Sequence, residues 1–155
     1  KAIAAHVPSL YAESSNGRAA PRFYIRGLGN ADFDLAASQP VSIIMDDVVM
    51  ENVVLKSSPL YDLVNVAVDR GPQGTRFGRN TTAGVIKFTS ARPTQEQDGY
   101  VSASLGKYDT ANVEGAFGDR LTDTLSFRVS GLYQHRDDWI DNAFTGQKGA
   151  LGGYD

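Results

Sequence analysis

The hydrophobic and polar positions follow two different patterns along the chain. Up to Gln97, short apolar runs rich in β-branched residues are separated by turn residues, whereas from Asp98 onward apolar and polar residues alternate. Runs of the first kind predict short strands. They lie at 22–27, at 41–50, around Val66 and Val68, and at 83–91.

A short helix is predicted between these strands. Ser58 is a suitable N-cap, and Pro59 follows it at the first helical position. Mixed strands and a short helix in the first part of the chain predict a small α+β domain.

The second part predicts a meander of antiparallel strands. In "GYVSASLG", Val101, Ala103 and Leu105 alternate with serines, and similar alternation recurs at 113–117 and 125–134. Alternation fits a half-buried sheet and fits equally the wall of an outer-membrane barrel, so periodicity leaves both interpretations open. The length of 124–136 exceeds the usual strand of about five or six residues and favours the barrel wall.

Composition removes several classes of function. The net charge of −3 gives a nucleic-acid partner no overall electrostatic support. The absence of cysteine excludes disulfides and thiolate metal sites. No apolar run approaches the ~20 residues that a membrane-spanning helix needs. The opening "KAIAAHVPSL" has neither an initiator Met nor a signal-peptide pattern, so we expect the chain to be a piece of a longer protein.

The segment "DRGPQGTRFGRNTTAG" (69–84) combines four glycines with three arginines. Three interpretations compete: a phosphate-binding loop, a surface that follows a nucleic-acid backbone, and a set of tight turns whose arginines pair with carboxylates. No Lys-Ser or Lys-Thr follows the glycines, so the phosphate-loop motif fails. We therefore favour turns and close contacts, with Arg70 and Arg79 in ion pairs.

The sequence predicts no catalytic or metal-binding site. No serine lies in a nucleophile-elbow pattern, and the carboxylates suit loops and turns better than paired acid and base chemistry. The stretch "NADFD" (30–34) is similar to the start of a calcium loop but lacks the glycine and the glutamate that such a loop needs. We expect no enzyme activity, no cofactor and no bound metal.

Several motifs together resemble TonB-dependent outer-membrane receptors. They are "FYIRGLG" at 23–29, the hairpin pattern at 41–50, "LYDLVNVAVDRGPQGTRFGRNTTAGVIKFTSARPT" at 60–94, and the alternating sequence that follows. The segment around "RGPQGTRFGRNTTAG" is highly specific to the plug domain of that family. The sequence departs from the family at Asp46-Asp47, where the family favours Asp-Gly, so we do not expect a simple type I′ turn there.

This resemblance implies the fold and the domain organisation. Residues 1–97 would be most of an α+β plug domain whose N-terminus is missing. Residues 98–155 would be the first antiparallel strands, about three, of a transmembrane β-barrel that has 22 strands in full. The TonB box and any signalling extension would precede Lys1.

The resemblance also implies the function. Such receptors lie in the outer membrane of Gram-negative bacteria, with the plug inside the barrel lumen and lipid around the barrel. They bind a scarce nutrient, most often a ferric siderophore, and import it to the periplasm with energy transmitted by TonB and its inner-membrane proton-driven complex. Two alternatives stay open: the same transporter class for glycans, haem or cobalamin, and a stand-alone plug that acts as a ligand-binding or signalling module. No nucleic acid is implied as a partner.

Two sets of site residues follow from the resemblance. Ligand contacts are expected at the outward tips of the plug, within 28–38 and 51–61. The candidates for ligand binding are Asn30, Asp32, Phe33, Glu51, Lys56 and Tyr61. The candidates for anchoring the plug to the barrel wall are Arg26, Arg70 and Arg79.

Overall fold

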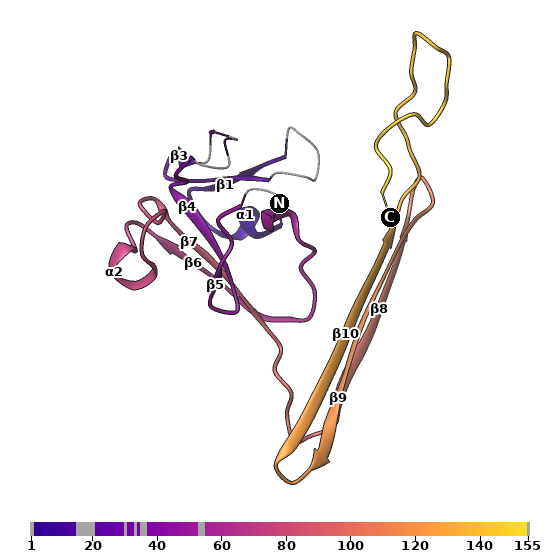
Figure 1. Ribbon diagram of the computed structural model, residues 1–155. Coiled ribbons are helices and arrows are strands. Elements are labelled where there is room, and N and C mark those ends of the chain that lie inside the picture. Colours follow the sequence, from indigo (N-terminus) through magenta and orange to yellow (C-terminus); the bar gives the residue numbers. More distant parts are fainter. Residues whose placement is uncertain are drawn as a thin grey trace. The chain divides into compact units, whose positions relative to one another are not determined.

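The chain forms two compact units, Lys1–Ser90 and Ala91–Asp155, and each is considered by itself (Figure 1). The computed structural model describes residues 2–14, 21–29, 31–32, 34, 37–52 and 55–154. Asn30 and Phe33, two of the predicted ligand contacts, lie outside the described residues.

A four-stranded sheet is the centre of the first unit. Its strands lie in the order β5 (Val48–Val49), β4 (Val41–Met45), β7 (Gly84–Ser90) and β6 (Leu63–Arg70). The two inner strands β4 and β7 are parallel, and the two outer pairings are antiparallel. The inner strands are the most apolar runs and are buried along most of their length, as expected for strands covered on both faces.

Smaller elements complete the core of this unit. Helix α1 (Ala2–His6) precedes a three-stranded sheet of β1 (Leu10–Glu13), β2 (Arg22–Ile25) and β3 (Leu28–Gly29). Buried apolar side chains from both sheets meet in one cluster, which consists of Leu10, Ile25, Val41, Ile43, Ala83, Ile86 and Phe88. The predicted strands at 22–27, 41–50 and 83–91, and the strand around Val66 and Val68, are confirmed.

The turn between β4 and β5 corrects one expectation. Asp46 has a φ of 47° and Asp47 a φ of 72°, and Met45 pairs directly with Val48 across them. Positive φ at both central residues of a two-residue turn is the requirement of type I′. Aspartate tolerates this conformation, and the Asp46 carboxylate accepts hydrogen bonds from the backbone N–H (2.7 Å) and the hydroxyl (2.6 Å) of Ser90. The second turn residue, Asp47, stands where Asp-Gly turns have glycine, and its carboxylate accepts a hydrogen bond from Lys87 Nζ (2.5 Å).

The helix predicted to begin at Ser58 is absent from the described residues 55–62. A 3₁₀ turn, η1 (Leu55–Ser57), lies before it instead. The Ser58 N–H donates to the carbonyl of Leu55 (3.3 Å), so Ser58 closes a turn rather than starting a helix. Four residues later Asp62 has a φ of 51°, which is incompatible with a continuing right-handed helix.

The second unit is an antiparallel meander, as predicted. Strands β8 (Asp98–Gly106), β9 (Thr110–Thr122) and β10 (Leu125–His135) pair in sequence order through short turns. The register places Ala103, Val113 and Tyr133 side by side, and likewise Phe117 beside Val129.

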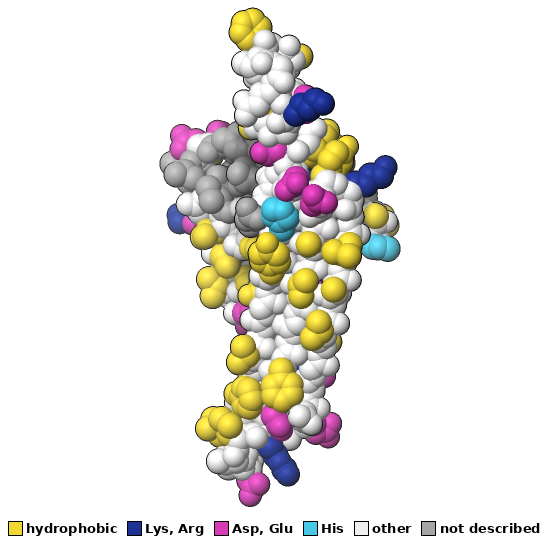
Figure 2. Space-filling view, turned by 90° about the vertical axis from the view of Figure 1, so that its right-hand side faces the viewer, with side chains coloured by type: hydrophobic (Ala, Val, Ile, Leu, Met, Phe, Trp, Pro, Cys, Tyr) yellow, Lys and Arg dark blue, Asp and Glu magenta, His cyan; other side chains and the backbone are white. Residues whose placement is uncertain are grey.

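The two faces of this meander differ in polarity. The apolar face is open, with Val101 82% and Leu105 88% exposed, and hydrophobic side chains lie along the length of the sheet (Figure 2). On the other face Arg128 donates to Asp98 (3.1 Å), and Asn112 donates to Ser104 (3.3 Å). The meander therefore has one apolar and one polar face.

The chain after β10 folds back on itself. Bridges join Arg136 with Tyr154 and Ile140 with Leu151. At the base of this segment the Arg136 guanidinium lies over the rings of Tyr108 (5.4 Å) and Trp139 (5.6 Å). Among the described residues, no helix is long and apolar enough to cross a membrane.

Candidate functional site

The glycine-rich segment forms a closed loop between β6 and β7. The Gly71 N–H donates to the Ala83 carbonyl (2.9 Å), and the Gln73 N–H donates to the Thr81 carbonyl (3.0 Å). Between these bonds, Gly74–Phe77 form the single helical turn α2. The Thr81 side chain is buried, and its hydroxyl donates to the Gly78 carbonyl (2.8 Å). Hydrogen bonds within the segment thus hold its two ends together and shape its central turn.

Close packing at the end of this loop requires a glycine. A Cβ atom at Gly84 would lie 2.4 Å from the Asp69 carbonyl oxygen and 2.8 Å from Ile25 Cδ1, and the φ of Gly84 is 153°. By contrast, a Cβ at Gly74 would meet nothing within 4 Å, and no positive φ is required there. The prediction that the glycines of this segment serve turns and close contacts is confirmed at Gly84, and for turns at Gly71 (φ 114°) and Gly78 (φ 78°); Gly74 makes no close contact.

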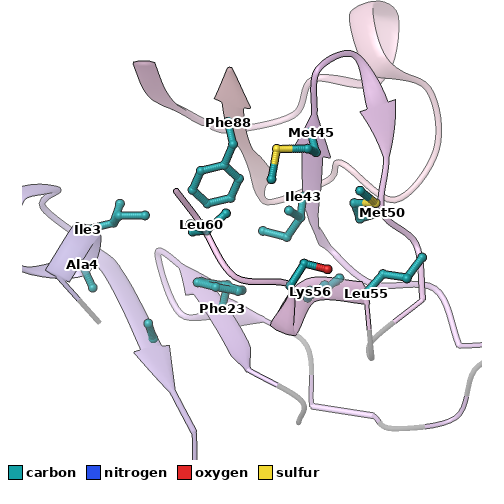
Figure 3. A pocket seen from close by; sticks show the side chains of 12 residues that line it. Ile3, Ala4, Phe23, Ile43, Met45, Met50, Leu55, Lys56, Leu60 and Phe88 are labelled. Atoms are coloured by element: carbon teal, nitrogen blue, oxygen red, sulfur yellow. The ribbon is translucent and has the colours of Figure 1, made fainter. Parts of the chain in front are cut away.

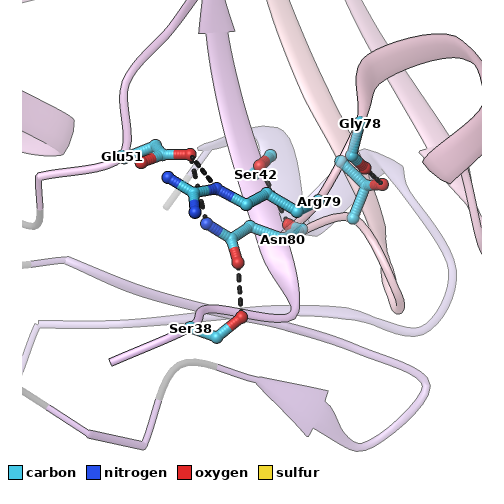
Figure 4. Close-up of polar contacts among 7 residues, drawn as sticks. Ser38, Ser42, Glu51, Gly78, Arg79 and Asn80 are labelled. Atoms are coloured by element: carbon cyan, nitrogen blue, oxygen red, sulfur yellow. Dashed lines mark hydrogen bonds and ion pairs between the residues drawn. The ribbon is translucent and has the colours of Figure 1, made fainter. Parts of the chain in front are cut away.

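Asn80 lies at the centre of a polar network that joins three segments of the first unit (Figure 4). Its side-chain oxygen accepts a hydrogen bond from the hydroxyl of Ser38, and its backbone carbonyl accepts one from the hydroxyl of Ser42 (2.9 Å). Its side-chain nitrogen donates to Glu51 Oε1 (3.2 Å). Asn80 therefore holds the glycine-rich loop to the segment before β4, to β4 itself and to the residue that follows the β4–β5 hairpin.

Arg79 shares the same carboxylate oxygen. Its Nε lies 3.6 Å from Glu51 Oε1, with the Arg79 side chain 83% and the Glu51 side chain 47% exposed. Exposed pairs of this kind contribute roughly 0–1 kcal/mol to stability. The sequence predicted separate roles for these two residues, ligand binding for Glu51 and anchoring for Arg79, and the structure brings them into contact.

Lys56 borders an apolar cavity of about 90 Å³ (Figure 3). The labelled side chains around it come from α1, β2, β4, β7 and residues 50–60, and include Phe23, Ile43 and Phe88. The Lys56 amine donates to the side-chain oxygen of the buried Gln39 and lies 3.4 Å from the Val41 carbonyl. Burial lowers the pKa of Lys56 from 10.5 to about 8, because a desolvated ammonium is disfavoured.

The other predicted site residues lie in separate places. Arg70 Nη1 donates to the Pro8 carbonyl (3.2 Å), which ties the end of β6 to the turn after α1. Arg26 lies in the turn between β2 and β3 with a φ of 53°, and its N–H donates to the Ser9 carbonyl (2.9 Å). Asp32 accepts a hydrogen bond from the N–H of Asp34 (2.9 Å), and Tyr61 is half-buried.

Sequence reasoning missed Asn80 and Ser38. Asn80 has a φ of 68°, in the left-handed region where asparagine is several-fold enriched. An asparagine after a Gly-Arg pair in a turn-rich stretch was a signal for this backbone conformation. Its side-chain partners, distant in sequence, had no such signal.

The described residues provide no metal centre. Within the described ranges, no three His, Cys, Asp or Glu side chains come close enough together to hold a metal ion. The polar network around Asn80 consists of hydrogen bonds and one exposed ion pair, which suit holding loops together.

Comparison with known proteins assigns the first unit to a family. Residues 1–85 match the model of the TonB-dependent receptor plug domain. The chain is 25% identical over 133 residues to the pesticin receptor of Yersinia pestis, a match that covers 85% of this chain and 19% of that protein. The pesticin receptor of Yersinia enterocolitica matches over the same shares at the same identity.

Solved structures show the same fold. The ferric yersiniabactin uptake receptor of Yersinia pestis superposes with a TM-score of 0.83 at 25% identity, over 95% of this chain and 23% of that one. The pyoverdine outer membrane receptor of Pseudomonas aeruginosa PAO1 superposes with a TM-score of 0.71 at 19% identity, over 90% of this chain and 20% of that one. The chain spans about a fifth of the length of these relatives.

Proposed function

Since the chain belongs to the TonB-dependent receptor plug domain family, we propose that it forms the plug and the first barrel strands of an outer-membrane nutrient transporter. The observation that carries this proposal is the match of residues 1–85 to the plug family. In this proposal residues 1–97 are the plug, residues 98–155 begin a 22-stranded barrel, and the complete protein lies in the outer membrane of a Gram-negative bacterium.

The meander of the second unit supports the barrel assignment. Its strands have 9, 13 and 11 residues, each long enough for a tilted strand to cross a bilayer, which takes about 9–11 residues. One face is apolar and exposed, which suits lipid, and the other carries the Arg128–Asp98 pair, which suits a polar lumen. An open edge of such a sheet cannot face hydrocarbon, so further strands are required to close it.

The cargo proposed first is a ferric siderophore. Two proteins of the same fold are receptors for ferric yersiniabactin and for pyoverdine. Haem, cobalamin or a glycan would suit the same transporter class and are the alternatives. A stand-alone plug that binds or signals is a further alternative, and the barrel-like strands that continue from the plug disfavour it.

The proposed mechanism is gating by binding. Ligand held at the plug tips and the outer loops shifts the conformational equilibrium of the plug. Force transmitted by TonB then opens a path through the lumen. The proposed ligand contacts are Asn30, Asp32, Phe33, Glu51, Lys56 and Tyr61, and the proposed anchors to the barrel wall are Arg26, Arg70 and Arg79. Substrate is moved without any bond being made or broken.

Binding by the complete protein tests this proposal. The protein, purified from outer membranes in detergent, would be titrated with ferric yersiniabactin, ferripyoverdine, haem, cobalamin and oligosaccharides while its tryptophan fluorescence is followed. We expect saturable binding of a ferric siderophore and none of the iron-free form at the same concentration. Saturable binding of another nutrient would replace the cargo, and absence of the protein from the outer-membrane fraction would contradict the transporter assignment.

A further inference from the structure

The side chain of Asn80 joins three segments of the first unit through hydrogen bonds. Ser38 lies before β4, and Glu51 follows the β4–β5 hairpin. Asn80 lies in the glycine-rich loop, 42 residues after Ser38 and 29 residues after Glu51. The amide of Asn80 accepts from Ser38 at its oxygen and donates to Glu51 from its nitrogen (Figure 4). An amide side chain can accept a hydrogen bond at its oxygen and donate one from its nitrogen, so Asn80 is chemically suited to bridge these two partners.

The backbone at Asn80 supports the same role. Its φ of 68° is accessible to asparagine at little cost, and the hydroxyl of the buried Ser42 donates a hydrogen bond to its carbonyl (2.9 Å). The backbone is therefore fixed by a residue of the core strand β4, while the side chain reaches exposed loops. This arrangement makes Asn80 a positioning residue between the core and the loops.

Glu51 Oε1 is the acceptor on which two contacts of the glycine-rich loop converge. Asn80 Nδ2 donates to it at 3.2 Å, and Arg79 Nε lies 3.6 Å from it. A group that draws this oxygen away would release Asn80 and Arg79 together. Because Glu51 is about half exposed, such a group can reach it from solvent.

We infer that Glu51, Arg79 and Asn80 form a latch that holds the glycine-rich loop closed, and that a ligand donating hydrogen bonds to Glu51 loosens this loop. The inference rests on the proposed transport function for its trigger, since Glu51 is one of the proposed ligand contacts. The latch itself rests on the contacts within the first unit. Asn80 is the positioning residue because it alone touches Ser38, Ser42 and Glu51 among the described hydrogen bonds.

Hydrogen exchange of the complete protein tests the latch without any ligand. Asn80→Gly removes both side-chain bonds and keeps a backbone that accepts positive φ. Amides of 71–83 should exchange about 10-fold faster in this variant, since each exposed hydrogen bond accounts for about a 2- to 10-fold change. Ser38→Ala removes only the hydroxyl bond to the Asn80 side-chain oxygen and keeps the donor to Glu51, so it should show part of the same acceleration. Asp109→Gly, the same kind of change at a positive-φ turn of the second unit, is the matched control and should leave 71–83 unchanged.

A double-mutant cycle tests whether Glu51 and Asn80 act on the glycine-rich loop through their shared hydrogen bond or independently of each other. Glu51→Ala and Asn80→Gly both remove the Asn80–Glu51 bond, so their effects on exchange of 71–83 should not multiply. The double variant should exchange about 2- to 10-fold more slowly than the product of the single effects. Fully multiplicative effects, or unchanged exchange in Asn80→Gly, would overturn the latch.

Ferric yersiniabactin is the probe for the trigger. When it binds, the amides of 71–83 should exchange faster in the wild-type protein. In the Glu51→Ala variant, saturating probe should change the exchange rate of these amides little. Binding with unchanged exchange in the wild-type protein would overturn the trigger. A complete lack of binding would contradict the proposed cargo, while the variants without ligand would still decide whether the latch exists.

Discussion

Gly84→Ala is the substitution for which the structure gives the clearest expected cost. The new methyl group would lie 2.4 Å from the Asp69 carbonyl oxygen, on the neighbouring strand β6, and 2.8 Å from Ile25 Cδ1 in the core. Neither neighbour can move freely, because one is backbone in a paired strand and Ile25 is fully buried. The φ of 153° adds a second penalty, because alanine rarely adopts this backbone conformation.

The size of the effect follows from these two penalties. Overpacking a core costs about 1–3 kcal/mol, and a residue in a sparsely populated backbone region costs about 1–3 kcal/mol. Together they predict at least about 2 kcal/mol, which is about 30-fold in an opening equilibrium. Amides of β4 and β7 should therefore exchange at least about 30-fold faster in the Gly84→Ala form of the complete protein.

Two glycines of the same loop serve as graded controls. Gly71 has a φ of 114° but open space around its Cβ position, so Gly71→Ala should incur the backbone penalty alone. Gly74 lies in α2 with open space and no positive φ, so Gly74→Ala should leave exchange unchanged or slow it slightly, because alanine is the better helix former. Exchange in Gly84→Ala that is less than 5-fold faster than in Gly74→Ala would refute the packing argument.

Three further predictions concern the first unit of the complete protein. Because the pKa of Lys56 is about 8 when folded and 10.5 in its ordinary state, folding releases a proton between these values, and stability against urea should rise with pH across this window. The stability of wild type relative to Lys56→Met, which also loses the hydrogen bond to Gln39, should rise from pH 7 to pH 10; a difference in stability that does not change with pH would contradict the burial of the amine. Ile86→Ala empties a fully buried position in β7 and should lower the free energy of unfolding by about 2–5 kcal/mol in urea titration, whereas a loss below 1 kcal/mol would contradict its place in the core. Asp46→Ala removes both bonds to Ser90 and places alanine at positive φ, so exchange at the Ser90 amide should accelerate about 10-fold or more, and an unchanged rate would show that the carboxylate does not hold this turn.

The long strands of the second part were predictable because their signal is local. Alternation over 98–106, 110–122 and 125–135 coincides with short polar connections, and each strand pairs with its neighbour in sequence. No long-range information was needed to find them. The apolar runs of β4 and β7 were predictable for a similar reason, since a strand covered on both faces shows a continuous apolar run.

The small elements could not be found from the sequence because tertiary contacts stabilise them. Helix α1 has only five residues, too few to be stable alone, and forms where Ile3, Ala4 and Val7 pack against the core. The reverse happened at Ser58, where a good N-cap followed by proline suggested a helix and the chain made a 3₁₀ turn before it. Local preferences at such short elements are weaker than packing.

The polar network shows the same limit for the site. The sequence suggested Glu51 and Arg79 as site residues, yet their contact depends on the parallel pairing of β4 with β7, which brings the residues after the β4–β5 hairpin beside the glycine-rich loop. The inward direction of Lys56 likewise follows from the position of Gln39 and Val41. The sequence could therefore single out Glu51, Lys56 and Arg79 as polar residues of interest, but it could not identify the residues that they contact.

Uptake by living cells tests the central proposal most directly. The complete protein would be expressed in an iron-starved Gram-negative strain that lacks its own siderophore receptors, and accumulation of radioactive iron from labelled ferric yersiniabactin and ferripyoverdine would be followed with and without TonB. The transporter assignment predicts saturable uptake of iron from at least one of these complexes that requires both the expressed protein and TonB. Uptake that is the same without TonB, or no greater than in cells lacking the protein, would contradict it.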